Sequence, residues 1–160
     1  MIDDFFNKKQ LNILKNNLNK ISFTPLIYKE TCDSYGFGHA FKKNKENEWL
    51  FKKIKNFIIK DKNLMLSESS FRLRHNFKKV LPHNDKDIAD YSFICYLKGK
   101  ELIYNGTGFY NDKKIIDRYI GFKENRIIFF DSKIFHTDLQ ALGESSLRYS
   151  LNIFYKYKRK

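Results

Sequence analysis

The chain has 160 residues, of which 42% are hydrophobic and 17% aromatic, and its formal net charge is +13 at pH 7. This length suits one domain with a real core, and the hydrophobic content excludes a chain that is disordered throughout. The charge would favour nucleic acid, an anionic substrate or an acidic partner, but the lysines are spread along the chain as on an ordinary solvated surface.

The spacing of the cysteines and the lengths of the apolar runs indicate the cellular compartment. Cys32 and Cys95 do not form a close pair, which argues against a disulfide scaffold or a zinc ribbon and favours a reducing compartment. Cys95 lies in an apolar run and is expected to be a buried thiol. The acidic segment 1–4 lacks the apolar region of a signal peptide, and no run approaches the ~18 residues of a membrane span. We therefore expect a soluble cytoplasmic protein.

The first 63 residues are predicted to be mainly helical. Asp3 or Asp4 can cap a first amphipathic helix. Residues 21–28 are strand-like, and the glycines of residues 33–39 predict a loop. Residues 46–59 have apolar side chains at helical spacing and predict a second helix.

From residue 64 onward the pattern is that of short strands. They are expected around residues 71–77, 91–97, 101–110, 119–122, 127–130, 134–136 and 147–155. About eight short strands after two helices predict a mainly β fold with N-terminal helices, a double-stranded β-helix (jelly roll) with the helices packed outside it. We expect a single domain over residues 1–160, with a helical part at about 1–63 and a jelly-roll core at about 64–156.

Two of the four histidines lie two residues before an aspartate, as His83–Asp85 and His136–Asp138. Side chains two apart on an extended segment point to the same side. If the second pair supplied a carboxylate ligand, no histidine would remain downstream to complete a three-residue site. The first pair leaves His136 available, so residue order selects His83, Asp85 and His136.

Such a set of two histidines and one carboxylate can occupy one face of a metal. It leaves coordination positions open for substrate and dioxygen, and it is typical of non-heme Fe(II) oxygenases. An isolated His-x-Asp is also a common surface polar pair, so the hypothesis depends on the remaining strands.

The final strand places Arg148, Ser150 and Asn152 on one face, at spacing i, i+2 and i+4. An arginine on the inner face of a barrel needs an anionic partner, because a lone buried charge is very costly. The partner is either a ligand carboxylate, to which Ser150 can add a hydrogen bond, or an Asp or Glu across the sheet. Tyr96 could present its phenol to the same carboxylate, or it is a core tyrosine. His75 either lies near the metal or is a core histidine.

Five segments in one order carry a family resemblance: His83-Asn84-Asp85, Phe93-Ile94-Cys95-Tyr96-Leu97, Gly106-Thr107-Gly108-Phe109-Tyr110, Phe130-Asp131-Ser132-Lys133-Ile134-Phe135-His136 and Arg148-Tyr149-Ser150-Leu151-Asn152. Their order and spacing resemble the Fe(II)/2-oxoglutarate-dependent dioxygenases, particularly the compact prolyl-hydroxylase-like branch. The resemblance covers about residues 70–156.

The resemblance implies roles for individual residues. His83, Asp85 and His136 would bind Fe(II), and Arg148 would bind the C5 carboxylate of 2-oxoglutarate together with Tyr96. Ser150 and Asn152 share the face of Arg148 and belong to the same expected co-substrate site. The family often has a tyrosine on the strand before His-x-Asp, and His75 stands at the best candidate position here. The strand Gly106–Phe109 departs from the family's Gly-Gly-x-Thr-x-Phe pattern.

The resemblance also implies a reaction, in which 2-oxoglutarate and O2 are consumed and succinate and CO2 are released as a substrate is hydroxylated. The substrate would be a protein side chain, such as a prolyl group, or a small molecule. An alternative reading of the charge is a basic nucleic-acid-binding or nucleic-acid-modifying protein on the same scaffold. A degenerate jelly roll that only binds a partner is a third hypothesis, but it has no need of the full set of site residues.

Overall fold

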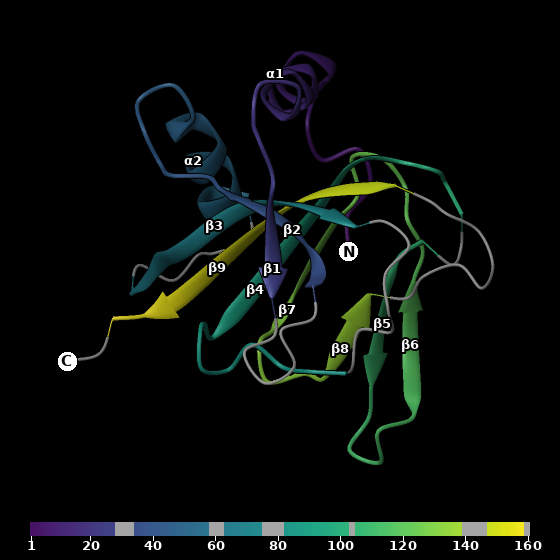
Figure 1. Cartoon of the computed structure of the whole chain (residues 1–160). Coiled ribbons are helices and arrows are strands. Elements are labelled where there is room, and N and C mark those ends of the chain that lie inside the picture. The colour runs from purple at the N-terminus through teal and green to yellow at the C-terminus, as the bar shows by residue number, and fades with distance from the viewer. Residues whose placement is uncertain (28–33, 58–62, 75–81, 103–104, 139–146, 159–160) are drawn as a thin grey trace.

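The computed structural model describes residues 1–27, 34–57, 63–74, 82–102, 105–138 and 147–158. Within these ranges the chain forms two helices and nine strands (Figure 1). They are α1 (Lys8–Leu18), β1 (Thr24–Ile27), β2 (Ser34–Ala40), α2 (Glu48–Phe57), β3 (Leu64–Arg74), β4 (Tyr91–Gly99), β5 (Thr107–Tyr110), β6 (Ile116–Ile120), β7 (Ile127–Asp131), β8 (His136–Asp138) and β9 (Arg148–Tyr157).

Helix α1 begins with a capping box. The Asn7 side chain accepts a hydrogen bond from the Gln10 backbone N–H at 2.9 Å, and the Gln10 side chain accepts one from the Asn7 backbone. These bonds satisfy donors that a helix N-terminus leaves unpaired. The expectation that Asp3 or Asp4 caps this helix is therefore wrong. Asp3 instead pairs with Arg126, whose Nε lies 2.6 Å from Oδ1.

Helix α2 carries Glu48 in its first turn, where a negative charge interacts well with the helix dipole. Its buried face consists of Leu50, Phe51 and Ile54. The pattern therefore predicts this helix well, with its described end at Phe57. Neither helix of the described chain has the length and apolar character needed to cross a bilayer.

The strands form two antiparallel sheets. The large sheet has the order β1-β2-β3-β9-β4-β7 and the small sheet has the order β6-β5-β8. Both helices cover one face of the large sheet, and the small sheet lies on its other side (Figure 1). The predicted jelly roll with helices packed outside it is confirmed.

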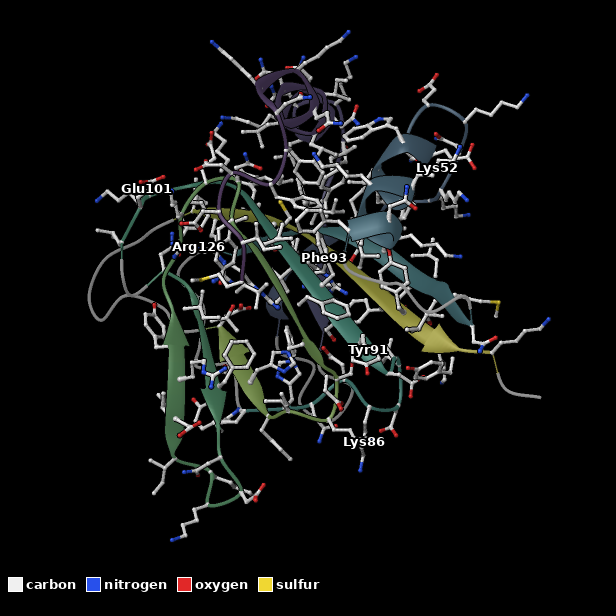
Figure 2. The ribbon with its side chains drawn as sticks, turned by 180° about the vertical axis from the view of Figure 1, so that it is seen from behind. Lys52, Lys86, Tyr91, Phe93, Glu101 and Arg126 are labelled. Carbon is white, nitrogen blue, oxygen red and sulfur yellow. The ribbon has the colours of Figure 1, made fainter. Side chains whose placement is uncertain are left out.

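Two apolar cores follow from this arrangement. The first lies between the helices and the large sheet, where Phe93 of β4 is fully buried and its ring centroid is 6.4 Å from that of Phe5 (Figure 2). The second lies between the sheets and comprises Ile94, Tyr96, Phe109, Phe122, Ile128 and Phe130. Lysines such as Lys52 and Lys86 are exposed at distant points of the surface (Figure 2).

The glycine-containing segment predicted to be a loop is instead the strand β2, paired with β1 and β3. Its glycines serve close packing rather than a turn. A Cβ added at Gly36 would overlap the guanidinium of Arg74, and one at Gly38 would stand 3.0 Å from the Leu26 side chain. The small size of Gly36 therefore makes room for a charged side chain on the neighbouring strand.

Residues before α1 pair with β7, the edge strand of the large sheet. The backbone N–H of Ile2 donates to the carbonyl of Ile127 at 3.0 Å, and the N–H of Ile127 donates back at 2.8 Å. The buried Asn125 side chain accepts from the Phe6 N–H and donates to the Phe6 carbonyl. This N-terminal segment is thereby held against the sheet.

Candidate metal centre

A backbone bridge brings the two ends of the candidate site together. His83 lies in the segment before β4, and its N–H donates to the His136 carbonyl at 3.0 Å, while the His136 N–H donates back at 2.8 Å. Residues opposite each other in an antiparallel bridge project to the same side. Asp85 follows two residues later, with its N–H bonded to the Ser132 carbonyl at 2.8 Å. These backbone hydrogen bonds together align all three side chains.

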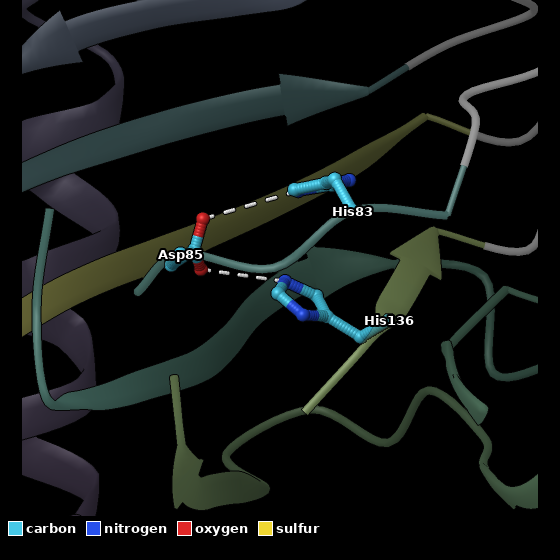
Figure 3. A group of neighbouring side chains, drawn as sticks. All are labelled: His83, Asp85 and His136. Carbon is cyan, nitrogen blue, oxygen red and sulfur yellow. Dashed lines mark ion pairs between the residues drawn. The ribbon is translucent and has the colours of Figure 1, made fainter. Parts of the chain in front are cut away.

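The three side chains converge on one point (Figure 3). One ligand atom of each of His83, Asp85 and His136 lies within 4.8 Å of the others. His136 Nε2 is 3.4 Å from Asp85 Oδ2, and His83 Nε2 is 4.0 Å from Asp85 Oδ1. Donors that each lie about 2.0–2.2 Å from a shared ion stand roughly 3–4 Å apart. The spacing is that of a metal site with two nitrogens and one carboxylate.

The protonation of His136 suits metal binding. Its Nδ1 lies 3.0 Å from the Ile134 carbonyl, which can only accept a hydrogen bond, so Nδ1 carries the proton and Nε2 presents a lone pair toward Asp85. Burial lowers the pKa of His136 and outweighs the nearby Asp85 carboxylate. The ring is therefore neutral at pH 7, as a ligand must be.

Asp85 is oriented by a chain of hydroxyls. The Ser92 hydroxyl donates to Asp85 Oδ2 at 3.1 Å. Ser92 Oγ is also 2.8 Å from Ser132 Oγ, and because the Ser92 proton is already used, Ser132 is the donor in that bond. Both serines are buried. This second layer fixes the carboxylate in the direction of the imidazoles.

Aromatic rings form one wall beside the site. The ring centroid of Phe130 lies 4.9 Å from that of His136, and that of Phe109 lies 6.3 Å away. Both rings belong to the core between the sheets. They keep water away from one side of the cluster.

A cavity of about 240 Å³ opens on the three residues. Its other lining residues are Arg72, Arg74, Asn84, Ile88, Ile94, Asp138, Asn152 and Phe154. A larger cavity of about 630 Å³ is lined by residues of β5, β6 and β7, among them Tyr119 and Ile128, and by none of the three. Chemistry at the cluster would therefore involve the smaller cavity.

Arg148 is buried, with 3% of its side chain exposed, and its guanidinium is largely occupied. Nη2 donates to the Asp138 carboxylate, and Nη1 donates to the carbonyls of Asn105 at 3.2 Å and Gly106 at 2.5 Å. The described residues offer no hydrogen-bond partner to its Nε. The guanidinium also lies 5.3 Å from the centroid of the Tyr96 ring. Of the two partners foreseen for Arg148, the structure shows the acidic residue across the sheets.

Asp138 is the residue that sequence reasoning missed. It projects from β8 on the same side as His136, and its Oδ2 lies 2.6 Å from Arg74 Nε. Burial alone would raise the pKa of Asp138, but Arg148 and Arg74 outweigh it and hold this pKa well below the ordinary value. The spacing from His136 is the signal that could have found it, although the pattern suggested only a competing metal ligand.

Of the other residues expected at the co-substrate site, the structure places only one of those that it describes on the cavity. The Tyr96 hydroxyl lies 2.8 Å from Thr107 Oγ1, and burial raises the pKa of Tyr96 to about 12, so its phenol is neutral. Ser150 Oγ donates to Asn152 Oδ1 at 2.8 Å, and of these residues Asn152 lines the cavity. His75 lies outside the described residues.

No protein-family model matches the chain, and no curated protein matches it in sequence. Solved structures do match its fold. A 2OG-Fe(II) oxygenase family oxidoreductase from Burkholderia pseudomallei has a TM-score of 0.70 at 10% identity, over 98% of this chain and 83% of that one. A prolyl-4-hydroxylase from Pseudomonas putida has a TM-score of 0.69 at 14% identity, over 99% of this chain and 91% of that one.

The fold of this chain is that of the 2OG-Fe(II) oxygenases. HygX from Streptomyces hygroscopicus, solved with nickel, 2-oxoglutarate and hygromycin B bound, is also similar, with a TM-score of 0.64 at 9% identity over 98% of this chain and 82% of that one. The resemblance seen in the sequence is thus confirmed at the level of the oxygenase fold. The nucleic-acid alternative gains no support from these similarities.

Proposed function

We propose that the whole chain is a single Fe(II)- and 2-oxoglutarate-dependent oxygenase domain. It would hydroxylate a protein side chain, such as a prolyl group, or a small molecule, with succinate and CO2 as co-products. The observation that carries the proposal is the convergence of His83, Asp85 and His136 on one cavity within this fold. Two imidazoles and one carboxylate suit Fe(II) and leave open coordination positions.

Each residue of the cluster has a part in holding the metal. His83 and His136 would donate Nε2, and Asp85 would donate one carboxylate oxygen. Bound iron would supply the activation of dioxygen, and 2-oxoglutarate would be the reductant of dioxygen beside the substrate. Ser92 keeps the carboxylate turned toward the imidazoles, and Phe130 shields one side of the site from water.

Arg148 is the proposed partner of the C5 carboxylate of 2-oxoglutarate. Asp138 already places a carboxylate against its guanidinium, so the surroundings of Arg148 accommodate such a group. The neutral phenol of Tyr96 can add a hydrogen bond to the same carboxylate. When the co-substrate takes over Arg148, Asp138 retains Arg74 as its ion partner. Arg148 would therefore exchange an internal carboxylate for an external one.

The test is an anaerobic titration with Fe(II) and 2-oxoglutarate, followed by measurement of succinate after air is admitted. We expect binding of both, slow succinate release, and loss of metal binding in His83→Ala. His39→Ala is the matched control, since His39 lies on β2 and its ring bonds the Ser22 carbonyl away from the cluster. Failure of the unaltered protein to bind Fe(II), or undiminished turnover in His83→Ala, would contradict the proposal.

A further inference from the structure

Three arginines share the inward face of the large sheet. Arg72 lies opposite Ser150 in the pairing of β3 with β9, and Arg74 lies opposite Arg148. Residues paired across strands project to the same face, and like charges directly opposite destabilise the pair. Asp138 offsets the repulsion between Arg74 and Arg148 because its carboxylate bonds both. Arg72 lies beyond that ion cluster.

The immediate partners of Arg72 are weak. Its Nε donates to Ser70 Oγ at 2.8 Å, a neutral acceptor. Its Nη2 stands 4.0 Å from Glu68, whose side chain is 50% exposed, whereas that of Arg72 is 17% exposed. A pair with one partner half in water contributes little. Arg72 thus lines the cavity of the metal cluster with a mostly buried side chain, and its carboxylate partner Glu68 stands 4.0 Å away and half in water.

The charges around the cavity indicate what charge a further ligand would carry. Arg72 and Arg74 line the cavity and Arg148 is bonded to Asp138 beside it, so these arginines contribute three positive charges, while Asp85 and Asp138, which also line it, contribute two negative ones. Glu68 is half exposed and does not line the cavity, so it stands outside this count. The histidine ligands are neutral when they hold a metal. A divalent ion and the doubly negative 2-oxoglutarate cancel each other, so the loaded cavity keeps one positive charge. One negative charge on a further ligand would balance it.

We propose that Arg72 is a specificity residue that binds a carboxylate of the substrate, which makes that substrate a small acid or an acidic side chain. This rests on the proposed function, because it assumes that 2-oxoglutarate occupies the Arg148 side. The planar guanidinium matches a carboxylate in two parallel hydrogen bonds. A single residual charge favours a carboxylate over a phosphate, which carries roughly 1.5–2 negative charges at pH 7. The cavity of about 240 Å³ admits only a small group.

Acetate and its neutral isostere acetamide serve as probes. The protein is loaded with Mn(II) and 2-oxoglutarate under nitrogen, and the relaxation of the carbonyl carbon of each probe, enriched in carbon-13, is followed as the probe is titrated. Because Mn(II) is paramagnetic, a carbon held in the cavity relaxes faster. We expect saturable enhancement for acetate and none for acetamide. Charge-assisted hydrogen bonds predict that Arg72→Gln weakens acetate binding by roughly 10-fold or more.

Arg118→Gln is the matched control, since Arg118 is an exposed arginine of β6 and lines the other cavity. It should leave acetate binding unchanged, and both variants should bind Mn(II) and 2-oxoglutarate as the unaltered protein does. Equal effects of acetate and acetamide, absence of saturation, or no change in Arg72→Gln would each overturn the proposed subsite. Loss of 2-oxoglutarate binding by the unaltered protein would instead overturn the oxygenase function, and the acetate result would still decide whether Arg72 binds an anion.

Discussion

Replacement of Asp138 by asparagine removes the carboxylate that bonds Arg74 and Arg148. The side chains of Asp138, Arg74 and Arg148 are 15%, 11% and 3% exposed, so water cannot replace the lost partner fully. Removing one member of a buried ion pair costs about 3–5 kcal/mol. The partial exposure of Asp138 and Arg74 places the expected loss near the lower limit, about 3 kcal/mol. In a chain of this size that lowers Tm by about 6–12 °C.

The same substitution should strengthen the binding of 2-oxoglutarate. In the unaltered protein the co-substrate must displace Asp138 from Arg148, whereas in Asp138→Asn the guanidinium has no internal carboxylate. Each tenfold gain in affinity adds about 1.4 kcal/mol of stabilisation at saturating ligand, or about 3–6 °C in Tm. The co-substrate should therefore recover part of the lost stability.

The assay is thermal unfolding of the Mn(II)-loaded protein, followed by circular dichroism with and without 2-oxoglutarate. Asp117→Asn serves as control, because Asp117 is an exposed carboxylate of β6. The reasoning fails if Asp138→Asn unfolds at the same temperature as the unaltered protein. It also fails if 2-oxoglutarate raises the Tm of both proteins equally, since Asp138 would then not compete for Arg148.

Three further predictions concern neighbouring contacts. Arg148→Ala should weaken 2-oxoglutarate binding by roughly 10-fold or more while Mn(II) binding stays within about twofold, as measured by calorimetry; equal loss of both would make Arg148 structural. Gly36→Ala should force Arg74 aside and destabilise the fold by about 1–3 kcal/mol, which an unchanged Tm would contradict. Arg126, by hydrogen bonding, lowers the pKa of Asp3 to about 2. Because a depressed pKa stabilises the fold only where the carboxyl is ionised, Asp3→Asn should lower Tm at pH 7, and this difference should shrink as the pH falls from about 4 to about 2; a difference of undiminished size at pH 2 would rule the pair out.

The sequence predicted the features that local pattern controls. The alternation of the later strands led to the jelly roll, and the order of His83, Asp85 and His136 led to a cluster that the structure brings together. Both depend on spacing within a segment and on the number of candidate histidines. The buried thiol of Cys95 was likewise predictable from its apolar neighbours, and its side chain is fully buried.

Contacts between distant strands were not predictable. The pairing of Asp138 with Arg148 joins the small sheet to the large one, and no local periodicity reveals which acid faces which base. The glycines of β2 predict a loop because glycine favours turns, whereas in the fold Gly36 is needed for the approach of Arg74 from the next strand. The cap at Asn7 shows the same limit, because Asp and Asn both favour an N-cap and only the long-range bonds of residues 2 and 6 to the sheet place the helix start after Asn7.

The pairing of Ile2 with Ile127 has a bearing on solubility. β7 ends the large sheet, and an uncovered edge strand offers unpaired N–H and C=O groups to other molecules. The residues before α1 occupy part of that edge, with the Asn125 side chain bonding the Phe6 backbone beside it. Loss of these residues would expose the edge of a strand with two Ile and two Phe side chains to other copies of the protein. By covering part of the edge of β7, this N-terminal segment opposes self-association of the protein.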